Sequence, residues 1–599
     1  MNEIELRLAS LRELMKREHL SAFIFPSTDA HQSEYVADHW RGREWISGFN
    51  GSAGTAVVTM TSAALWTDSR YFLAAEEQLE GTEYQLMKLK IEGTPTIAEW
   101  LGKELQEVQS PEVGLDGMVN SYNYVKDLSY SLRKLGGITL RTNLDPLAQI
   151  WENRPSLPAN PVEIQPLEYA GETLASKVAR IRKSLRKLHA DGMLVSALDD
   201  IAWTLNLRGT DVHCNPVFVS YLLIESDKVS LFVDDNKLSP EVKQYLQDNQ
   251  VSLYKYNKVE KCLESYSEYN ILLDGNETSY YLWKAVKCQE IVAAGSPIPA
   301  MKAVKNKAEI EGYHSAMLKD GVAMVKFLKW LKPAVEAGGQ TEISIDEKLT
   351  SLRAEQKLFR DISFDTIAGY AQHGAIVHYE ATPETDVVLK PEGLILIDSG
   401  AQYQDGTTDI TRTIALGPVS EEMKHIYTLV LKAHIQLELV KFPDGASGTQ
   451  LDAVGRECMW REGYNFLHGT GHGVGSYLCV HEGPHQIRME WMPTPLRAGM
   501  TITDEPGIYL AGEFGVRIEN TLLVTNYVQT DFGKFLQMEP LTLCPIDTAP
   551  IEMELMTPEE KKWLNDYHRM VFEKLSPWLE EDDKNWLKEA TKPLYNHWG

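Results

Sequence analysis

The chain has 599 residues, enough for about three to five domains with large cores. Its 59 Lys and Arg against 85 Asp and Glu give a formal net charge of −26, which repels nucleic-acid phosphates and anionic lipids. We therefore expect no nucleic acid and no membrane among its partners. No apolar run reaches the ~18 residues of a membrane span, the N-terminus lacks a signal-peptide pattern, and the six cysteines form no CxxC pair. A cytoplasmic protein with reduced thiols is expected.

The first half of the chain contains the same predicted order of elements twice. Apolar residues at helical spacing over 4–15 precede a short strand at 22–25, and those over 178–188 precede a strand at 193–195. In both places a Trp-bearing stretch and two further strand-like runs follow. This order is typical of α/β domains, in which helices cover a sheet. The sequence therefore predicts two related α/β domains.

Two clusters of prolines divide the chain, one over 155–166 and one over 295–299. Clustered prolines continue neither a helix nor a central strand, and they are typical of domain boundaries. We predict domains over residues 1–158, 159–300 and 301–599.

The third segment begins and ends with predicted helices. Apolar residues over 310–331 have helical spacing, and the chain after residue 545 is also predicted to be helical. Thr557-Pro558-Glu559-Glu560 is a capping box with proline at the first helical position. We expect three tryptophans to anchor this tail to the domain, namely Trp563, Trp578 and Trp586.

The segment 394–413 predicts a β-hairpin with Asp398 and Asp409 on either side of a turn near Asp405-Gly406. The apolar residues Leu394–Ile397 indicate that the first strand is buried. Two aspartates facing each other in a buried hairpin repel, and they stay ionised when a cation lies between them. The hairpin therefore predicts part of a cation site.

A second predicted hairpin has the same character, with Glu505 and Glu519 at equal separations from Gly512. Between the two hairpins lies the glycine-rich segment His468–Gly475, which carries two histidines. Its glycines allow the backbone to approach a ligand closely, and its histidines can point into the same space. One of them, His472, is the expected imidazole ligand.

These segments together supply four carboxylates and one imidazole. The candidate metal ligands are Asp398, Asp409, His472, Glu505 and Glu519. Carboxylate-rich ligation favours hard divalent cations, and four acids exceed what one ion needs. Two ions bridged by shared carboxylates fit this set, and such pairs generate a hydroxide for hydrolysis. The set predicts a metal-dependent hydrolase.

Two other motif matches in this region are weaker. His481-Glu482-Gly483-Pro484-His485 matches the H-E-x-x-H pattern of zinc-protease helices, but proline alone costs a helix about 3 kcal/mol. The Gly469–Gly475 run lacks the spacing of a dinucleotide loop, and no Walker lysine follows it. We therefore expect neither a zinc-protease helix nor a nucleotide site.

The third segment resembles the pita-bread metallopeptidases, which include methionine aminopeptidases, prolidases and aminopeptidases P. The motifs that carry the resemblance are Ile397–Gly400, Thr408–Arg412, His468–Gly473, Glu505–Gly507 and Val516–Glu519. They fill all five ligand positions of the family in order. The resemblance implies an α/β (α+β) protein with two creatinase-like domains followed by a pita-bread catalytic domain.

The whole chain is similar to the cytosolic aminopeptidase P subfamily, which removes an N-terminal residue that precedes proline. The subfamily pattern in the first domain comprises Ser33–Tyr35, Arg43–Trp45, Gly48–Thr55 and Trp66–Tyr71. Prolidases usually have a shorter, two-domain chain without this pattern. In two places the chain departs from its relatives: His373 ends a Tyr370–His373 segment where many have Gly-Pro-Asn, and Asn50 replaces a commoner Thr.

The resemblance also implies roles for the candidate ligands. Asp409 and Glu519 would bridge the two ions, and Asp398 would complete the first. His472 and Glu505 would complete the second, and Glu505 would also act as the general base for the attacking hydroxide.

Further residues would act on the substrate. His378 and His481 are similar to the family histidines that stabilise the scissile carbonyl and the tetrahedral intermediate. Positions expected at the substrate cleft or behind the ligands are His468, Arg517, His485 and Arg70. The expected substrates are peptides with an N-terminal Xaa-Pro sequence.

Several alternatives remain at this point. The metals are expected to be Mn²⁺, with Zn²⁺ or Co²⁺ as alternatives, and the family resemblance implies a homodimer. Prolidase activity on Xaa-Pro dipeptides is the alternative within the same class. A non-catalytic pita-bread binding module is the alternative from another class, although such relatives have lost ligands that this chain retains.

Overall fold

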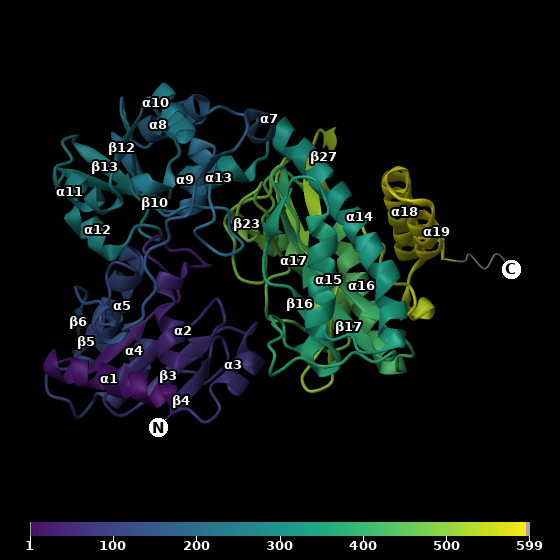
Figure 1. The fold of residues 1–599 in the computed structure, drawn as a ribbon, viewed down its shortest axis with the longest axis horizontal. Coiled ribbons are helices and arrows are strands. Elements are labelled where there is room, and N and C mark those ends of the chain that lie inside the picture. The colour runs from purple at the N-terminus through teal and green to yellow at the C-terminus, as the bar shows by residue number, and fades with distance from the viewer. Residues whose placement is uncertain (1, 595–599) are drawn as a thin grey trace. The chain divides into compact units, whose positions relative to one another are not determined.

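The structure is a computed structural model that describes residues 2–594 (Figure 1). The chain forms two compact units. Unit 1 contains the chain up to Pro166 together with Glu172–Ile298, and unit 2 contains Leu167–Gly171 and the chain from Pro299 onward. Within the described residues, no helix combines the length and apolar character that a membrane crossing requires.

The first sheet of unit 1 has six strands in the order β4-β3-β2-β1-β5-β6. The strands are β1 (Ala22–Phe25), β2 (Thr55–Thr59), β3 (Ala63–Thr67), β4 (Tyr84–Lys88), β5 (Glu112–Leu115) and β6 (Thr139–Arg141). The longer helices are α1 (Glu3–Arg17), α4 (Ile97–Glu104) and α5 (Tyr122–Gly136). Successive side chains of β1 enter different cores: Phe23 packs with Leu11 of α1, and Ile24 packs with Leu101 of α4. Helices therefore cover both faces of this sheet.

The second sheet of unit 1 repeats this topology, with the strand order β12-β11-β10-β8-β13-β14. The strands are β8 (Gly192–Val195), β10 (Ser220–Glu225), β11 (Val229–Val233), β12 (Val251–Tyr254), β13 (Asn270–Leu273) and β14 (Glu290–Ala293). Their helices are α8 (Leu174–Lys187), α9 (Leu198–Leu205), α10 (Pro240–Asp248), α11 (Val259–Glu264) and α12 (Tyr280–Ala285). The parallel and antiparallel pairings match those of the first sheet strand for strand. The prediction of two related α/β domains is confirmed.

Unit 2 is built from small antiparallel sheets and long helices. The helices are α14 (Lys307–Ala337), α15 (Glu342–Ala354), α16 (Glu421–Leu439) and α17 (Gly448–Trp460). Strand β17 (Leu394–Ser399) is buried along its whole length. Its Ile395 and Ile397 pack with residues of α14 and α15, while Leu394 packs with residues of α16. The sheet that carries the first aspartate is thus enclosed by helices on both faces, which makes its polar side chains costly to leave unpaired.

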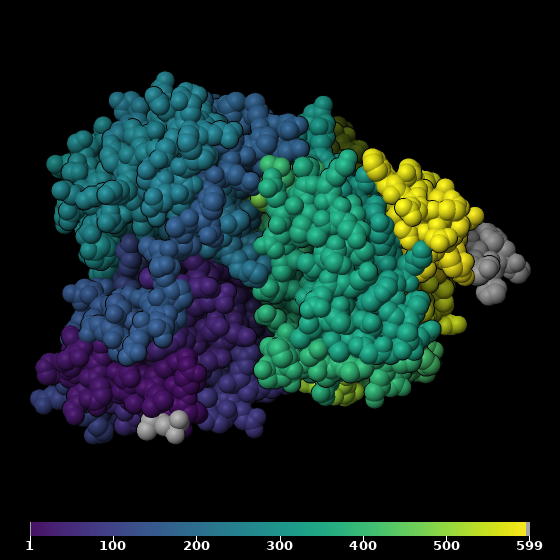
Figure 2. Space-filling view, in the orientation of Figure 1, coloured from purple at the N-terminus to yellow at the C-terminus, as the bar shows by residue number. Residues whose placement is uncertain are grey.

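The C-terminal tail consists of α18 (Pro558–Leu575) and α19 (Glu581–Ala590), and Figure 2 shows these helices, in yellow, at the surface of unit 2. Helix α18 begins with the predicted capping box of Thr557 and Glu560. Trp563 and Trp586 pack against the core, as predicted. The prediction for Trp578 is wrong: it is 66% exposed, because it ends the short turn that connects the two helices instead of lying on a buried helical face.

Candidate metal centre

The first pair of acids lies on a hairpin that is longer than its sequence suggests. Strand β17 pairs with β20 (Ile410–Ala415), and Asp398 is opposite Thr411. The intervening residues form two further short strands, β18 (Ala401–Tyr403) and β19 (Gly406–Thr407), which pair with each other. Asp409 therefore lies just before β20 and not directly across the ladder from Asp398. Their carboxylate oxygens and one of Glu519 nevertheless lie within 4.8 Å of one another.

The second pair of acids flanks a hairpin of β25 (Gly507–Leu510) and β26 (Phe514–Arg517). Gly512 in its turn has a φ of 78°, a left-handed conformation that favours glycine. Glu505 precedes this hairpin, and its N–H donates to the carbonyl of Thr470 at 2.8 Å. Glu519 follows it, and its N–H donates to the carbonyl of Thr411 at 3.0 Å. Backbone hydrogen bonds therefore attach Glu519 to the first hairpin and Glu505 to the glycine-rich segment.

His472 lies in β22 (Gly471–Gly473), which pairs with β23 (Glu482–Ile487). Its Nε2 is 3.4 Å from Asp409 Oδ2 and 3.2 Å from Glu505 Oε1. Its Nδ1 is 2.8 Å from the carbonyl oxygen of Gly473, to which it can donate its proton. This contact leaves Nε2 as the nitrogen that faces the acids, which is the arrangement of a metal-ligating histidine.

The structure thus brings all five predicted ligands together. They fall into overlapping groups whose ligand atoms lie within 4.8 Å of one another: Asp398–Asp409–Glu519, His472–Glu505–Glu519 and Asp409–His472–His481. Asp409, Glu519 and His472 each belong to two groups, and of these the carboxylates of Asp409 and Glu519 are the ones expected to bridge two ions. His481, predicted as catalytic, also borders the cluster, and its ring centroid is 4.6 Å from that of His472.

Two unpaired oxygen atoms indicate that a cation fits this cluster. Asp398 Oδ1 and Glu519 Oε1 are buried and have no hydrogen-bond partner among the described residues. Each residue uses only its other oxygen within the protein: Asp398 Oδ2 accepts from Arg517, and Glu519 Oε2 accepts from Thr411. A buried, unpaired carboxylate oxygen is costly unless it coordinates a cation. The donor set of four carboxylates and one imidazole suits hard divalent ions.

The ionisation of the acids reflects the same crowding. Burial raises the pKa of Asp398 to about 7, with Arg517 opposing the shift and Asp409 adding to it. Burial and the charge of Asp409 raise the pKa of Glu519 well above its usual range. Burial also acts to raise the pKa of Glu505, but the hydrogen bond and charge of His472, together with the charge of Arg517, outweigh burial and lower this pKa to about 2. A cation between these groups would remove the repulsion that favours their protonated forms.

The chelated protein is expected to become less stable as the pH rises. The pKa of Asp398 rises from 3.8 to about 7 on folding. Between these values the folded state binds more protons than the unfolded state, so the free energy of unfolding falls with increasing pH. The temperature at which half of the chelated protein is unfolded should therefore decrease as the pH is raised from about 4 to about 7. The decline should be smaller in Asp398→Asn, and equal declines in the two proteins would contradict the assignment.

The H-E-x-x-H match is not a zinc-protease helix, as expected from its proline. Glu482–Ile487 forms strand β23, so His481 and His485 do not share a helical face. His485 is 1% exposed, and its Nε2 is 2.6 Å from the carbonyl oxygen of Thr501. Burial lowers the pKa of His485 to about 4, which keeps its imidazole neutral. Its predicted contact with substrate stays a prediction.

Arg517 connects several parts of the candidate site. Its Nη2 donates to Asp398 Oδ2 at 2.7 Å and to the carbonyl of Val377 at 3.3 Å, and Val377 directly precedes His378. Its Nη1 donates to the hydroxyl of Tyr509 at 2.8 Å. Arg517 is 1% exposed, so its guanidinium supports Asp398 and the backbone next to His378 from within the protein. Arg517 therefore contacts the candidate ligand Asp398 without being a candidate ligand itself.

The remaining predicted residues lie in different surroundings. His468 Nε2 is 2.8 Å from the hydroxyl of Tyr509, and burial lowers the pKa of His468 to about 4. Arg70 lies in unit 1, where it donates to both carboxylate oxygens of Asp68 at 2.8 Å.

His373, the residue at which the chain departs from its relatives, has its Nδ1 2.8 Å from Glu342 Oε1. Its ring also stacks on a neighbouring tyrosine, which gives this unusual residue a local structural role.

Two supporting residues were not singled out from the sequence. Thr411 Oγ1 donates to Glu519 Oε2 at 2.8 Å, and Tyr509 connects Arg517 to His468. Thr411 lies within the Thr408–Arg412 motif, so its position beside Asp409 was a usable signal. Tyr509 is an ordinary aromatic residue of a strand, and its role depends on contacts that only the folded chain creates.

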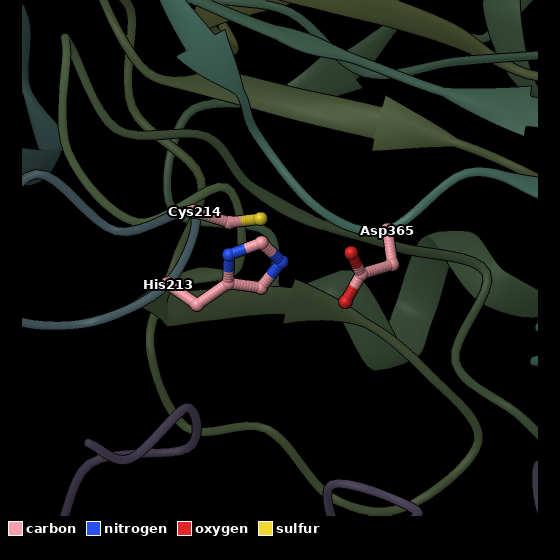
Figure 3. Close-up of side chains that lie close together, drawn as sticks. All are labelled: His213, Cys214 and Asp365. Carbon is pink, nitrogen blue, oxygen red and sulfur yellow. The ribbon is translucent and has the colours of Figure 1, made fainter. Parts of the chain in front are cut away.

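A further group of residues with potential ligand atoms is not part of this centre. Figure 3 shows His213, Cys214 and Asp365 as sticks. His213 and Cys214 lie between β9 (Leu207–Arg208) and β10 of unit 1, whereas Asp365 lies between β15 (Phe359–Ile362) and β16 (Ile367–Tyr370) of unit 2. Because the three residues belong to different units, we assign them no metal site.

Comparison with known families accounts for nearly the whole chain. Residues 7–141 and 153–309 each match the creatinase/prolidase N-terminal domain. Residues 311–526 match metallopeptidase family M24, and residues 534–594 match the C-terminal region of that family.

Individual relatives cover the full chain. A probable Xaa-Pro aminopeptidase P of Paracoccidioides brasiliensis (strain Pb03) is 40% identical over 98% of this chain and 99% of its own length. Xaa-Pro aminopeptidase 1 of Dictyostelium discoideum is 39% identical over 99% of this chain and 97% of its own. The X-prolyl aminopeptidase of Caenorhabditis elegans, described as a cytosolic enzyme with a di-nuclear active site, is 34% identical. Its crystal structure matches with a TM-score of 0.94 and covers 99% of this chain and 100% of that one.

The match to prolidases is partial by comparison. The prolidase from Pyrococcus horikoshii OT3 is 26% identical, with a TM-score of 0.50, and covers 62% of this chain and 99% of its own. Full-length similarity at about 40% identity, the matched catalytic domain and the two N-terminal domains agree with one another. The chain therefore belongs to metallopeptidase family M24, in its Xaa-Pro aminopeptidase P group.

Proposed function

We propose that this protein is a metal-dependent aminopeptidase that releases the N-terminal residue from peptides with proline in the second position. The observation that carries the proposal is the cluster of five candidate ligands in unit 2, with two buried carboxylate oxygens that have no hydrogen-bond partner within residues 2–594. Full-length similarity to proteins named Xaa-Pro aminopeptidase supports the substrate class.

The candidate ligands suit two divalent ions. Asp409 and Glu519 are proposed to contact both ions, Asp398 the first, and His472 and Glu505 the second. When bound, a pair of divalent cations supplies Lewis-acid chemistry that generates a nucleophile at neutral pH and polarises a carbonyl. Oxygen-rich ligation favours Mn²⁺, and Zn²⁺ or Co²⁺ are alternatives.

The residues around the ligands are proposed to move protons and to hold the substrate. Glu505 is proposed to accept a proton from the attacking water, since its carboxylate lies within the cluster of candidate ligands. His481, beside His472, and His378, next to the backbone that Arg517 holds, are proposed to donate hydrogen bonds to the developing oxyanion. His468, His485 and Arg70 are proposed as substrate contacts.

The chemistry of an Xaa-Pro bond suits such a site. Its nitrogen is a tertiary amide without an N–H, so proteases that bind substrate as an extended strand lose a hydrogen bond there. A site that recognises a free N-terminus and a proline ring does not need that hydrogen bond. We therefore expect the enzyme to require an unblocked N-terminal residue followed by proline.

Location and assembly are also proposals. The six cysteines are free thiols, as in proteins of reducing compartments, and the related C. elegans enzyme is described as cytosolic. We propose a cytoplasmic location. A homodimer is proposed from the family resemblance alone.

Peptide length separates the proposed activity from prolidase activity. The enzyme should cleave the first bond of Xaa-Pro-Xaa tripeptides with a kcat/KM at least about tenfold above that for Xaa-Pro dipeptides. Xaa-Ala-Xaa peptides are the matched control for the requirement for proline. Preference for the dipeptides would indicate a prolidase, and binding of peptides without cleavage would indicate a non-catalytic module.

A further inference from the structure

A buried group of charged residues lies next to the candidate metal ligands and is not part of them. His434 of α16 lies between Glu438, one helical turn further along, and Asp504, which ends strand β24 (Thr501–Asp504). Its Nε2 is 3.1 Å from Glu438 Oε1, and its Nδ1 is 3.1 Å from Asp504 Oδ2. All three side chains are at most 3% exposed. Each ring nitrogen therefore faces a different buried carboxylate.

His434, Glu438 and Asp504 form a buried triad whose potential ligand atoms lie within 4.8 Å of one another. Burial alone would lower the pKa of His434, but the two carboxylates raise it to about 9. His434 Nδ1 also lies 3.3 Å from the backbone carbonyl oxygen of Asp504, so the ring contacts both the main chain and the side chain of that residue.

These contacts lead to both glutamate ligands. Asp504 directly precedes Glu505, and it pairs with Asn520, the first residue of strand β27 (Asn520–Thr530), which directly follows Glu519. Asn520 Nδ2 donates to Glu438 Oε1 at 2.9 Å. The triad therefore connects α16 to β24, which ends just before Glu505, and to β27, which begins just after Glu519.

The other side of Asn520 is fixed by Arg412 and by the C-terminal tail. Arg412 donates from Nη1 to the carbonyl of Glu519 at 2.6 Å and from Nη2 to Asn520 Oδ1 at 2.8 Å. Its Nη2 also donates to the hydroxyl of Tyr567 in α18 at 3.0 Å. Trp563, one turn earlier in α18, meets the ring of His434 edge-on with centroids 5.8 Å apart. Helix α18 thus covers the network on the side of the tail.

We propose that His434 is a positioning residue for the metal centre: by joining Asp504 to Glu438, and through Glu438 to Asn520, it holds Glu505 and Glu519 at the spacing that binds the ions. The inference rests on the proposed metal ligands. Residues that orient ligands without touching the metal typically change metal affinity by about 10–100-fold when replaced. Loss of His434 should therefore weaken metal binding before it affects peptide recognition.

The test measures binding of Mn²⁺ alone to the chelated, full-length chain, by the electron paramagnetic resonance signal of the free ion. His434→Gln should weaken Mn²⁺ binding by about tenfold or more. At limiting Mn²⁺ its kcat should fall, whereas its KM for an Xaa-Pro-Xaa peptide should stay within about twofold, and saturating Mn²⁺ should restore much of the rate. Glu438→Gln should have a similar effect. The double variant should bind about as weakly as the weaker single variant, because both changes remove the same connection.

The matched control is His568→Gln. His568 is also 1% exposed and lies in the same unit, but its Nε2 accepts the backbone N–H of Ile546 at 3.0 Å, a contact that glutamine can replace. Its Mn²⁺ affinity should stay within about twofold of the parent. If His434→Gln does not fold, Tyr567→Phe provides the test, because it removes one hydroxyl that contacts Arg412, and it should weaken Mn²⁺ binding by about threefold.

Each outcome supports or overturns the inference. If His434→Gln folds and binds Mn²⁺ as tightly as the parent, the inference is overturned and the proposed function stays intact. If His434→Gln does not fold, an unchanged Mn²⁺ affinity in Tyr567→Phe has the same consequence. Equal weakening in His568→Gln would also overturn it, because the effect would then follow from any buried substitution. A parent protein that binds no Mn²⁺, Zn²⁺ or Co²⁺ would overturn the proposed function and the inference together.

Discussion

Replacing Asp409 with alanine is expected to lower kcat/KM for an Xaa-Pro-Xaa peptide on the order of 10³-fold or more. Asp409 belongs to two of the groups of potential ligand atoms, one with Asp398 and Glu519 and one with His472. Its removal would take a shared ligand from both ions. Elemental analysis of the purified variant should find fewer than two metal ions per chain, and steady-state assays with the same peptide should give the loss of rate.

Asp405→Asn is the control for this variant. Asp405 is a buried aspartate of the same hairpin, but both of its oxygens contact Lys319 Nζ at 2.7 Å. Its replacement removes an ion pair without removing a candidate ligand, so the metal content should match that of the parent. Full activity in Asp409→Ala would contradict the proposed mechanism, and loss of metal in Asp405→Asn would show that any disturbance of the hairpin releases the ions.

Replacing His481 with alanine is expected to lower kcat by about 10²-fold or more without changing the number of bound metals. His481 borders the cluster through its edge-on contact with the ring of His472, and it is proposed to donate a hydrogen bond to the developing oxyanion. An interaction that strengthens in the transition state affects kcat more than KM. Steady-state kinetics and elemental analysis on the same preparation measure both quantities.

The metal content distinguishes catalysis from ligation at this position, because the ligand atoms of His481 also lie within 4.8 Å of those of Asp409 and His472. Loss of a metal ion in His481→Ala would identify His481 as a sixth ligand and contradict its proposed role. His378→Ala is the companion variant, and it should also lower kcat with two ions retained. Unchanged kcat in His378→Ala would remove that residue from the proposed mechanism.

The sequence predicts the candidate centre well because its ligands belong to short, local motifs. Asp398 follows an apolar run that predicts a buried strand, and Glu505 and Glu519 flank a turn in which Gly512 has a left-handed φ. The structure confirms the proximity of these acids. The exact pairing was less predictable, because β18 and β19 extend the first hairpin and move Asp409 out of register with Asp398.

Residues whose role depends on distant contacts were not predictable. His434 lies in a long apolar helix, where nothing in the local pattern distinguishes it from a packed core residue. Its partner Asp504 is 70 residues further along the chain. The tail shows the same limit: Trp563 packs against the core as expected, but Trp578 is exposed because it lies in the short turn between the two tail helices.

The relation between bound metal and activity tests the central claim most directly. The purified chain should contain two divalent ions, lose its cleavage of an Xaa-Pro-Xaa peptide on chelation, and recover it as Mn²⁺ is returned to about two ions per chain. Xaa-Ala-Xaa peptides should remain uncut throughout. Undiminished cleavage of the Xaa-Pro-Xaa peptide after complete removal of metal would contradict the account.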